Sequence, residues 1–83
     1  MPLVTTNEML KKAQESHYAV GAFNVENMEM VMAVVKAAEE MKAPVIMQTT
    51  PSTVKYAGLD YFLAMVKTAA ERASVPIAMH LDH

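Results

Sequence analysis

Two short stretches decide the fold: APVIMQT at residues 43–49 and VPIAMHL at residues 75–81. In each, a proline follows a segment with helical periodicity and opens a run of apolar residues. Proline cannot continue a helix, and it restricts the residue before it to extended conformations. Short apolar runs bounded in this way are typical of strands that are buried on both faces. The sequence therefore predicts two strands, over 44–49 and 76–81, that begin in the same manner.

A third apolar stretch, YAVGAFNV at residues 18–25, predicts an earlier buried strand that carries Asn24 at its carboxyl end. Between these strands, apolar residues recur at helical spacing over 26–42 and again over 60–73. The chain therefore alternates strand, helix, strand, helix, strand.

A further helix is predicted over residues 5–16, because Thr5 and Glu8 have the capping-box spacing. In all three helices an apolar face is expected to pack inward. Its predicted members are Met9, Leu10 and Ala13 in the first helix, Met28, Val31, Val34 or Val35, Ala38 and Met41 in the second, and Phe62, Leu63, Val66, Ala69 and Ala70 in the third.

The strands follow one another at about 25–32 residues, which is the size of a βαβ unit with parallel strands. Right-handed crossovers bring the carboxyl ends of such strands to one side of the sheet. Asn24, the polar cluster at 49–53 and the pair Asp82-His83 are therefore expected along one rim. Polar residues at 49–53 are expected to form the turn after the second strand.

We expect an α/β fold in which three parallel strands with covering helices form the N-terminal part of a (β/α)8 TIM barrel. Such a barrel usually has about 250 residues, and a three-stranded piece leaves an unpaired edge. Residues 1–83 are thus expected to be the incomplete N-terminal segment of a single barrel domain. A flavodoxin-like doubly wound sheet fits the same pattern and remains an alternative.

Composition excludes several classes of protein. The 83 residues carry a net charge of −2 without a basic stripe, which argues against nucleic-acid binding. The longest apolar run, residues 30–35, is far shorter than the ~20 residues that span a bilayer, and no secretory signal begins the chain. The absence of cysteine excludes disulfides and thiolate zinc sites within these residues and fits a cytoplasmic setting.

The densest group of ionisable side chains is His80-Leu81-Asp82-His83. Strand alternation puts His80 and Asp82 on one face, and His83 becomes a ligand at the rim if the strand ends near residue 82. A carboxylate beside a metal-bound imidazole is well suited to proton transfer. The four residues fit equally well a core histidine, a helix-capping aspartate and an exposed histidine.

Other polar candidates allow both a functional and an ordinary interpretation. The hydroxyls of residues 49–53, Thr50 among them, could cradle a phosphate at a strand-to-helix turn, or could simply form loop and cap contacts. Asn24 could bond a substrate oxygen or form a turn. The sequence has nine methionines, and those at positions 28, 32 and 41 fit a helix face packed in a core better than a binding surface.

The sequence closely resembles the N-terminus of the class II, metal-dependent ketose-bisphosphate aldolases. The resemblance covers essentially the whole chain, and the His-Leu-Asp-His that follows a Val-Pro strand is its most specific part. The matching stretches are YAVGAFN at 18–24, AAEE at 37–40, APVI at 43–46, YAG at 56–58 and VPIAMHLDH at 75–83.

The resemblance implies a TIM-barrel lyase that cleaves fructose- or tagatose-1,6-bisphosphate to dihydroxyacetone phosphate and an aldehyde, usually as a dimer or tetramer. It implies that Asp82 moves the proton of the C4 hydroxyl. It also implies that His83 is the first of three histidine ligands of a catalytic Zn²⁺. This ion acts as a Lewis acid on the carbonyl group of the substrate. By the same resemblance, Asn24 contacts the substrate near its reacting carbons and Thr50 lies near a phosphate, while His80 supports the site without binding the metal.

Three alternatives stay open from the sequence. The substrate could be the tagatose instead of the fructose bisphosphate, which differ only in configuration at C4. The chain could be a non-catalytic barrel fragment or binding module. A metal-dependent hydrolase barrel is disfavoured, because no His-x-His pair occurs. Because the other two histidines are missing, the 83 residues alone are expected to be inactive.

Overall fold

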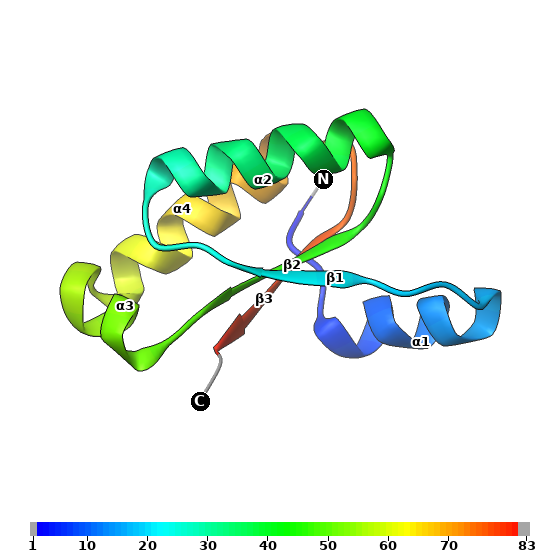
Figure 1. Cartoon of the computed structure of the whole chain (residues 1–83), viewed down its shortest axis with the longest axis horizontal. Helices are drawn as coiled ribbons and strands as arrows, with labels where there is room; N and C mark the ends of the chain where they lie inside the picture. Colours follow the sequence, from blue (N-terminus) through cyan, green and yellow to red (C-terminus); the bar gives the residue numbers. More distant parts are fainter. Residues whose placement is uncertain (1, 82–83) are drawn as a thin grey trace.

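The computed structural model describes residues 2–81, which form a three-stranded sheet and four helices (Figure 1). The strands are parallel and lie in the order β1-β2-β3. A flavodoxin-like sheet has the order 2-1-3, so this alternative is wrong. In chain order the elements are α1 (Thr6–Ser16), β1 (Gly21–Asn24), α2 (Met28–Met41), β2 (Val45–Thr49), α3 (Pro51–Ala57), α4 (Leu59–Arg72) and β3 (Ile77–Leu81).

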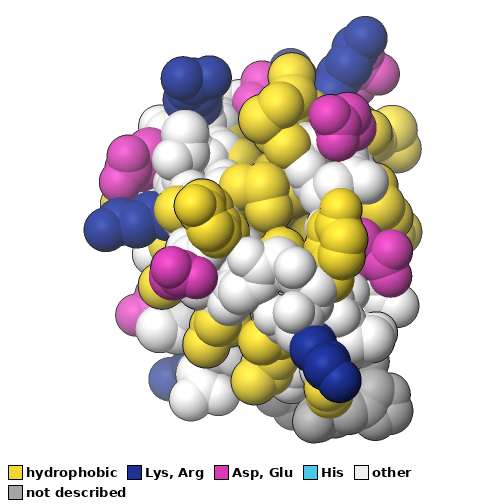
Figure 2. Space-filling model, turned by 90° about the vertical axis from the view of Figure 1, so that its left-hand side faces the viewer, with side chains coloured by type: hydrophobic (Ala, Val, Ile, Leu, Met, Phe, Trp, Pro, Cys, Tyr) yellow, Lys and Arg dark blue, Asp and Glu magenta, His cyan; other side chains and the backbone are white. Residues whose placement is uncertain are grey.

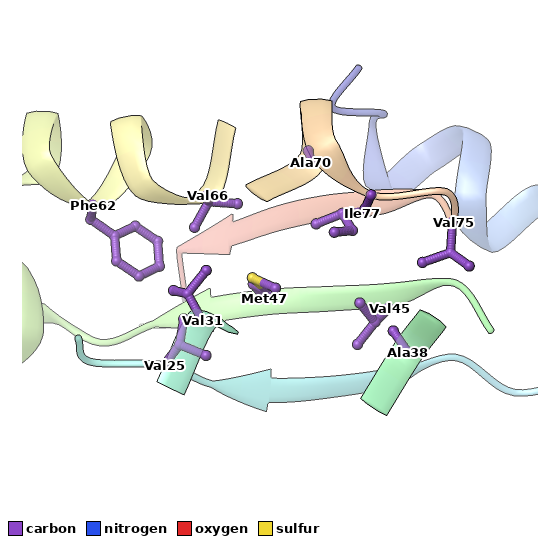
Figure 3. Close-up of a cluster of buried hydrophobic side chains, with 11 residues drawn as sticks. Val25, Val31, Ala38, Val45, Met47, Phe62, Val66, Ala70, Val75 and Ile77 are labelled. Carbon is purple, nitrogen blue, oxygen red and sulfur yellow. The ribbon is translucent and has the colours of Figure 1, made fainter. Parts of the chain in front are cut away.

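Helices α2 and α4 pack against each other and cover one face of the sheet (Figure 1). The main core lies between these helices and the strands. Phe62 and Val66 of α4 point from above toward Met47 of β2, and Val31 of α2 closes the cluster beside them (Figure 3). All four side chains are buried, so this face provides most of the apolar burial that stabilises the fold.

Helix α1 lies on the opposite side of the sheet, against β3 (Figure 1). A smaller cluster forms there from Met9 of α1, Ile46 of β2 and Ala78 of β3. Just before α1, the amide of Val4 donates to the carbonyl of Ile77 at 3.0 Å. Because Ile46 and Ala78 are the second residues of their strands, α1 covers only the amino-terminal part of this face.

Helices α1 and α2 each begin with a side-chain cap. The Oγ1 of Thr5 accepts from the amide of Glu8 at 3.2 Å, which confirms the cap predicted from the sequence. The Oδ1 of Asn27 accepts from the amide of Met30 at 2.9 Å at the start of α2. These bonds satisfy backbone donors that would otherwise have no partner in the first helical turn.

Two predictions about local structure are wrong. The polar cluster predicted as a turn after β2 instead begins helix α3, with Pro51 in its first turn, where a missing amide costs nothing. This helix ends at Gly58, whose φ of 93° is open to glycine and strained for other residues. The first strand, predicted to be buried, covers only Gly21–Asn24, and all four residues are exposed, because α1 and α4 pack against β3 at the other edge of the described sheet.

Within the helices, the predicted inward faces are too wide. Phe62, Val66 and Ala70 repeat every four residues and are buried, whereas Leu63 is 41% exposed. The residues predicted to pack inward that the structure exposes are Leu10, Met28, Met32, Met41 and Leu63. A helical period marks the centre of an apolar stripe but leaves its edges undetermined, since neighbouring elements decide how much of it is covered.

Within residues 2–81, none of the helices combines the length and apolarity needed to cross a lipid bilayer.

We predict that Phe62→Ala destabilises the protein by about 3–5 kcal/mol, because it leaves a cavity at a fully buried position. Leu63→Ala is the matched control on the same helix and should cost less than about 1 kcal/mol. Urea unfolding of the full-length variants measures both. Equal losses would show that the side of α4 facing the sheet is assigned wrongly.

Candidate functional site

Three polar side chains form a row across the sheet near the carboxyl ends of its strands. The register pairs Asn24 of β1 with Gln48 of β2, and Gln48 with His80 of β3. Residues that are paired in a parallel sheet project to the same face. The row therefore lies on the face that α1 covers, one step beyond the apolar row that includes Ile46 and Ala78.

A hydrogen bond joins two members of this row. The Nε2 of Gln48 donates to the Oδ1 of Asn24 at 2.8 Å. Asn24 and His80 are exposed and Gln48 is half-buried, so the row is open to a ligand in the described structure. The amides and the imidazole offer hydrogen-bond donors and acceptors that suit hydroxyl, carbonyl and phosphate oxygens.

A group of hydroxyls lies at the turn from β2 into α3. Thr50 precedes the first residue of α3, and its hydroxyl is 2.9 Å from that of Ser52 and 3.5 Å from that of Thr53. Thr53 is buried and Thr50 is half-buried, so Thr50 is the more accessible of the two. Thr50 thus follows the carboxyl end of the strand that carries Gln48.

A polar groove of about 390 Å³ lies beside these hydroxyls. It is lined by Glu26, Asn27, Ser52, Thr53 and Tyr56, from the turn before α2 and from α3. Figure 2 shows the molecule from this end, toward which the strands run, and its surface mixes hydrophobic side chains with acidic and basic ones. The carboxyl end of the sheet therefore carries a polar row, a hydroxyl cluster and a groove.

The described residues do not form a metal site by themselves. Residues 2–81 contain no group of three His, Cys, Asp or Glu side chains close enough to hold an ion. His80 is the histidine in the polar row, and its neighbour there is the amide of Gln48. The predicted proton-transfer residue Asp82 and the predicted metal ligand His83 lie outside the described residues.

The structure therefore brings Asn24 and His80 onto one face and puts Thr50 after the adjacent strand end. It adds Gln48, which the sequence analysis did not single out. In the sequence, Gln48 is marked only as a polar residue after the apolar run 45–47, and its alignment with Asn24 follows from the parallel register of the structure.

Comparison with known proteins gives the same family from sequence and from structure. Residues 4–83 match the family model of fructose-bisphosphate aldolase class-II. The chain belongs to the class II fructose-bisphosphate aldolase family. It is 46% identical over 82 residues to a fructose-bisphosphate aldolase of Helicobacter pylori, and 49% identical over 81 residues to one of Thermus caldophilus.

The crystal structure of the YdjI aldolase from Escherichia coli K12 superimposes with a TM-score of 0.87 at 38% identity. The alignment covers 98% of this chain and 32% of that structure. Likewise, the Helicobacter and Thermus matches each cover 98% of this chain but 27% and 26% of the relatives' length. The described fold is thus part of the α/β barrel of this aldolase family, and the face opposite α2 and α4 is the one that a barrel turns inward.

Proposed function

We propose that the full-length protein catalyses the reversible aldol cleavage of a ketose 1,6-bisphosphate, with fructose 1,6-bisphosphate giving dihydroxyacetone phosphate and glyceraldehyde 3-phosphate. The observation that carries the proposal is the identity of 46–49% to fructose-bisphosphate aldolases over nearly the whole chain. The polar row supports it, since catalytic groups of such barrels lie at the carboxyl ends of the strands.

In this proposal the chain's own residues bind and orient the substrate and move one proton. Asn24 donates a hydrogen bond near the reacting carbons, and the hydroxyl of Thr50 bonds a phosphate. Asp82, which follows β3 in the sequence, holds and returns the proton of the C4 hydroxyl as the carbon–carbon bond breaks and re-forms. His80, which lies in β3, supports the site without binding the metal.

The proposed enzyme also needs a divalent metal, Zn²⁺ by family resemblance, with His83 as one ligand. Residues 2–81 do not supply three ligands, so the remaining ones would come from other parts of the full-length protein. When bound, the ion supplies Lewis-acid polarisation of the substrate's carbonyl. The family resemblance also supports a cytoplasmic homo-oligomer, a dimer or a tetramer.

Removal of metal tests the class of mechanism. We expect EDTA to lower the cleavage of fructose 1,6-bisphosphate by the full-length protein at least about a hundredfold, because the ion contributes several kcal/mol to the transition state. Added Zn²⁺ should restore the rate. Cleavage that persists in fully metal-free protein would contradict the proposal.

The proton-transfer role of Asp82 predicts a loss of turnover. Asp82→Asn should lower kcat by about 10²–10⁴-fold, which is the usual contribution of a general acid–base group. Asp60→Asn makes the same chemical change at an exposed position in the first turn of α4 and should leave kcat within about twofold. A steady-state assay of both variants checks this. If kcat of Asp82→Asn equalled that of Asp60→Asn, Asp82 would not have the proposed role.

The phosphate role of Thr50 predicts an effect on substrate affinity. Thr50→Val removes the hydroxyl and should raise KM about 10–100-fold, since a hydrogen bond to a charged group contributes about 1.5–3 kcal/mol. Thr50→Ser keeps the hydroxyl and should stay within about threefold of wild type. An unchanged KM in the valine variant would contradict phosphate binding at this residue.

A further inference from the structure

A groove between helices α2 and α4 forms an apolar surface away from the candidate site. Its volume is about 580 Å³. Its larger apolar lining residues are Met28, Met32 and Val35 of α2 and Tyr61 and Met65 of α4. The two helices lie side by side on the face of the sheet opposite α1 (Figure 1). The groove and the polar row are therefore on different sides of the molecule.

Closure of the barrel leaves this groove in place. The helices of a (β/α)8 barrel form an outer ring, and each follows its own strand. Helix α2 connects β1 to β2, while α3 and α4 connect β2 to β3, so α2 and α4 belong to consecutive units of that ring. Further strands extend the sheet beyond its edges at β1 and β3, and their helices follow them. We therefore expect the groove on the outer surface of the complete barrel.

The side chains along this groove are large, apolar and exposed. Met28 is 55% exposed, Met32 is 61% exposed and Tyr61 is 70% exposed. A contiguous apolar patch on the surface of a globular protein usually marks a contact with another molecule. Met28 and Met32 are four residues apart on α2, so they form a ridge along the helix beside the groove.

We propose that this groove is an interface between two copies of the protein. One copy has both parts of the contact, the ridge of Met28 and Met32 and the groove next to it. In a two-fold dimer the ridge of one copy enters the groove of the other, and symmetry repeats the contact in reverse. The inference rests on the proposed homo-oligomer, and it names the surface that forms it.

The charges at the groove are complementary to those of a second copy. Lys36, Glu39 and Arg72 are exposed and lie among the lining residues. Because one surface carries both signs, Glu39 of each copy can pair with a basic side chain of the other, and symmetry makes two such pairs. A surface of a single sign would repel its own copy. An apolar centre with a polar rim is also the usual composition of a protein interface.

Sedimentation velocity of the full-length protein tests the proposal by measuring the mass of the assembly. Met32→Glu places a carboxylate in the apolar contact and should raise the dissociation constant of this interface at least about a hundredfold, which halves the mass. Lys67→Glu introduces the same side chain at an exposed position of α4 outside the groove lining and should leave the mass unchanged. Far-UV circular dichroism checks that both variants are folded.

The charge pairs are tested separately at low salt. Glu39→Lys leaves only basic side chains at the groove and should also halve the mass, because like charges then meet across the interface. Adding Lys36→Glu restores both signs and should restore the wild-type mass. A double variant that stays dissociated would overturn the charge pairing.

A folded Met32→Glu variant with the wild-type mass would overturn the proposal. If that variant fails to fold, an unchanged mass of Glu39→Lys would overturn it instead. A wild-type monomer in which Met32 resists oxidation by hydrogen peroxide would show that another segment of the same chain covers the groove. An active monomer would remove this inference alone, whereas an oligomer that dissociates as expected but cleaves no ketose bisphosphate would remove the proposed reaction and leave the interface in place.

Discussion

Hydrogen bonding between three parallel strands in one register determines where every other part of this structure lies. The register pairs Gly21 with Val45 and Val45 with Ile77, and alternation then assigns each later residue to a face. One face of β2 turns Val45 and Met47 toward α2 and α4, while the other turns Ile46 toward α1 and Gln48 toward the open part of the sheet. A slip of one residue would exchange the two sets, so the apolar core and the polar row are specified together.

The same short strands therefore serve stability and the candidate site at once. In β2, the buried Met47 lies between Ile46 and Gln48 in sequence and points away from both. Burial on the helix-covered face holds the backbone, and the backbone in turn fixes the spacing between Asn24 and Gln48. A substitution in the core could thus disturb ligand binding by shifting a strand without touching any polar group.

Much of the fold could be predicted from the sequence, because its signals are local. Proline after a helical segment marked the starts of β2 and β3, and helical spacing located α2 and α4 to within a few residues. Helix α3 was missed, because its sequence, PSTVKYA, resembles a polar turn and a proline is compatible with both. The exposure of Leu63 was missed because it depends on neighbouring elements and not on periodicity.

The candidate site was only partly predictable. Asn24, the cluster at 49–53 and the pair Asp82-His83 were expected along one rim. The structure has Asn24 and Thr50 at the carboxyl ends of β1 and β2, and the register adds His80 on the face that carries Asn24. Gln48 escaped notice because a single polar residue in an apolar strand has no meaning until its neighbours on other strands are known. The roles of Asp82 and His83 came from family resemblance, and they remain proposals.

Helix α1 contributes an apolar side chain next to the polar row. Its Met9 packs on Ile46 and Ala78, which are two residues before Gln48 and His80 on the same face of the sheet. Water on that side of the amides is therefore displaced by a thioether and aliphatic carbon, and the local dielectric constant falls. The polarity around the amides then depends in part on α1, a helix that comes before the first strand.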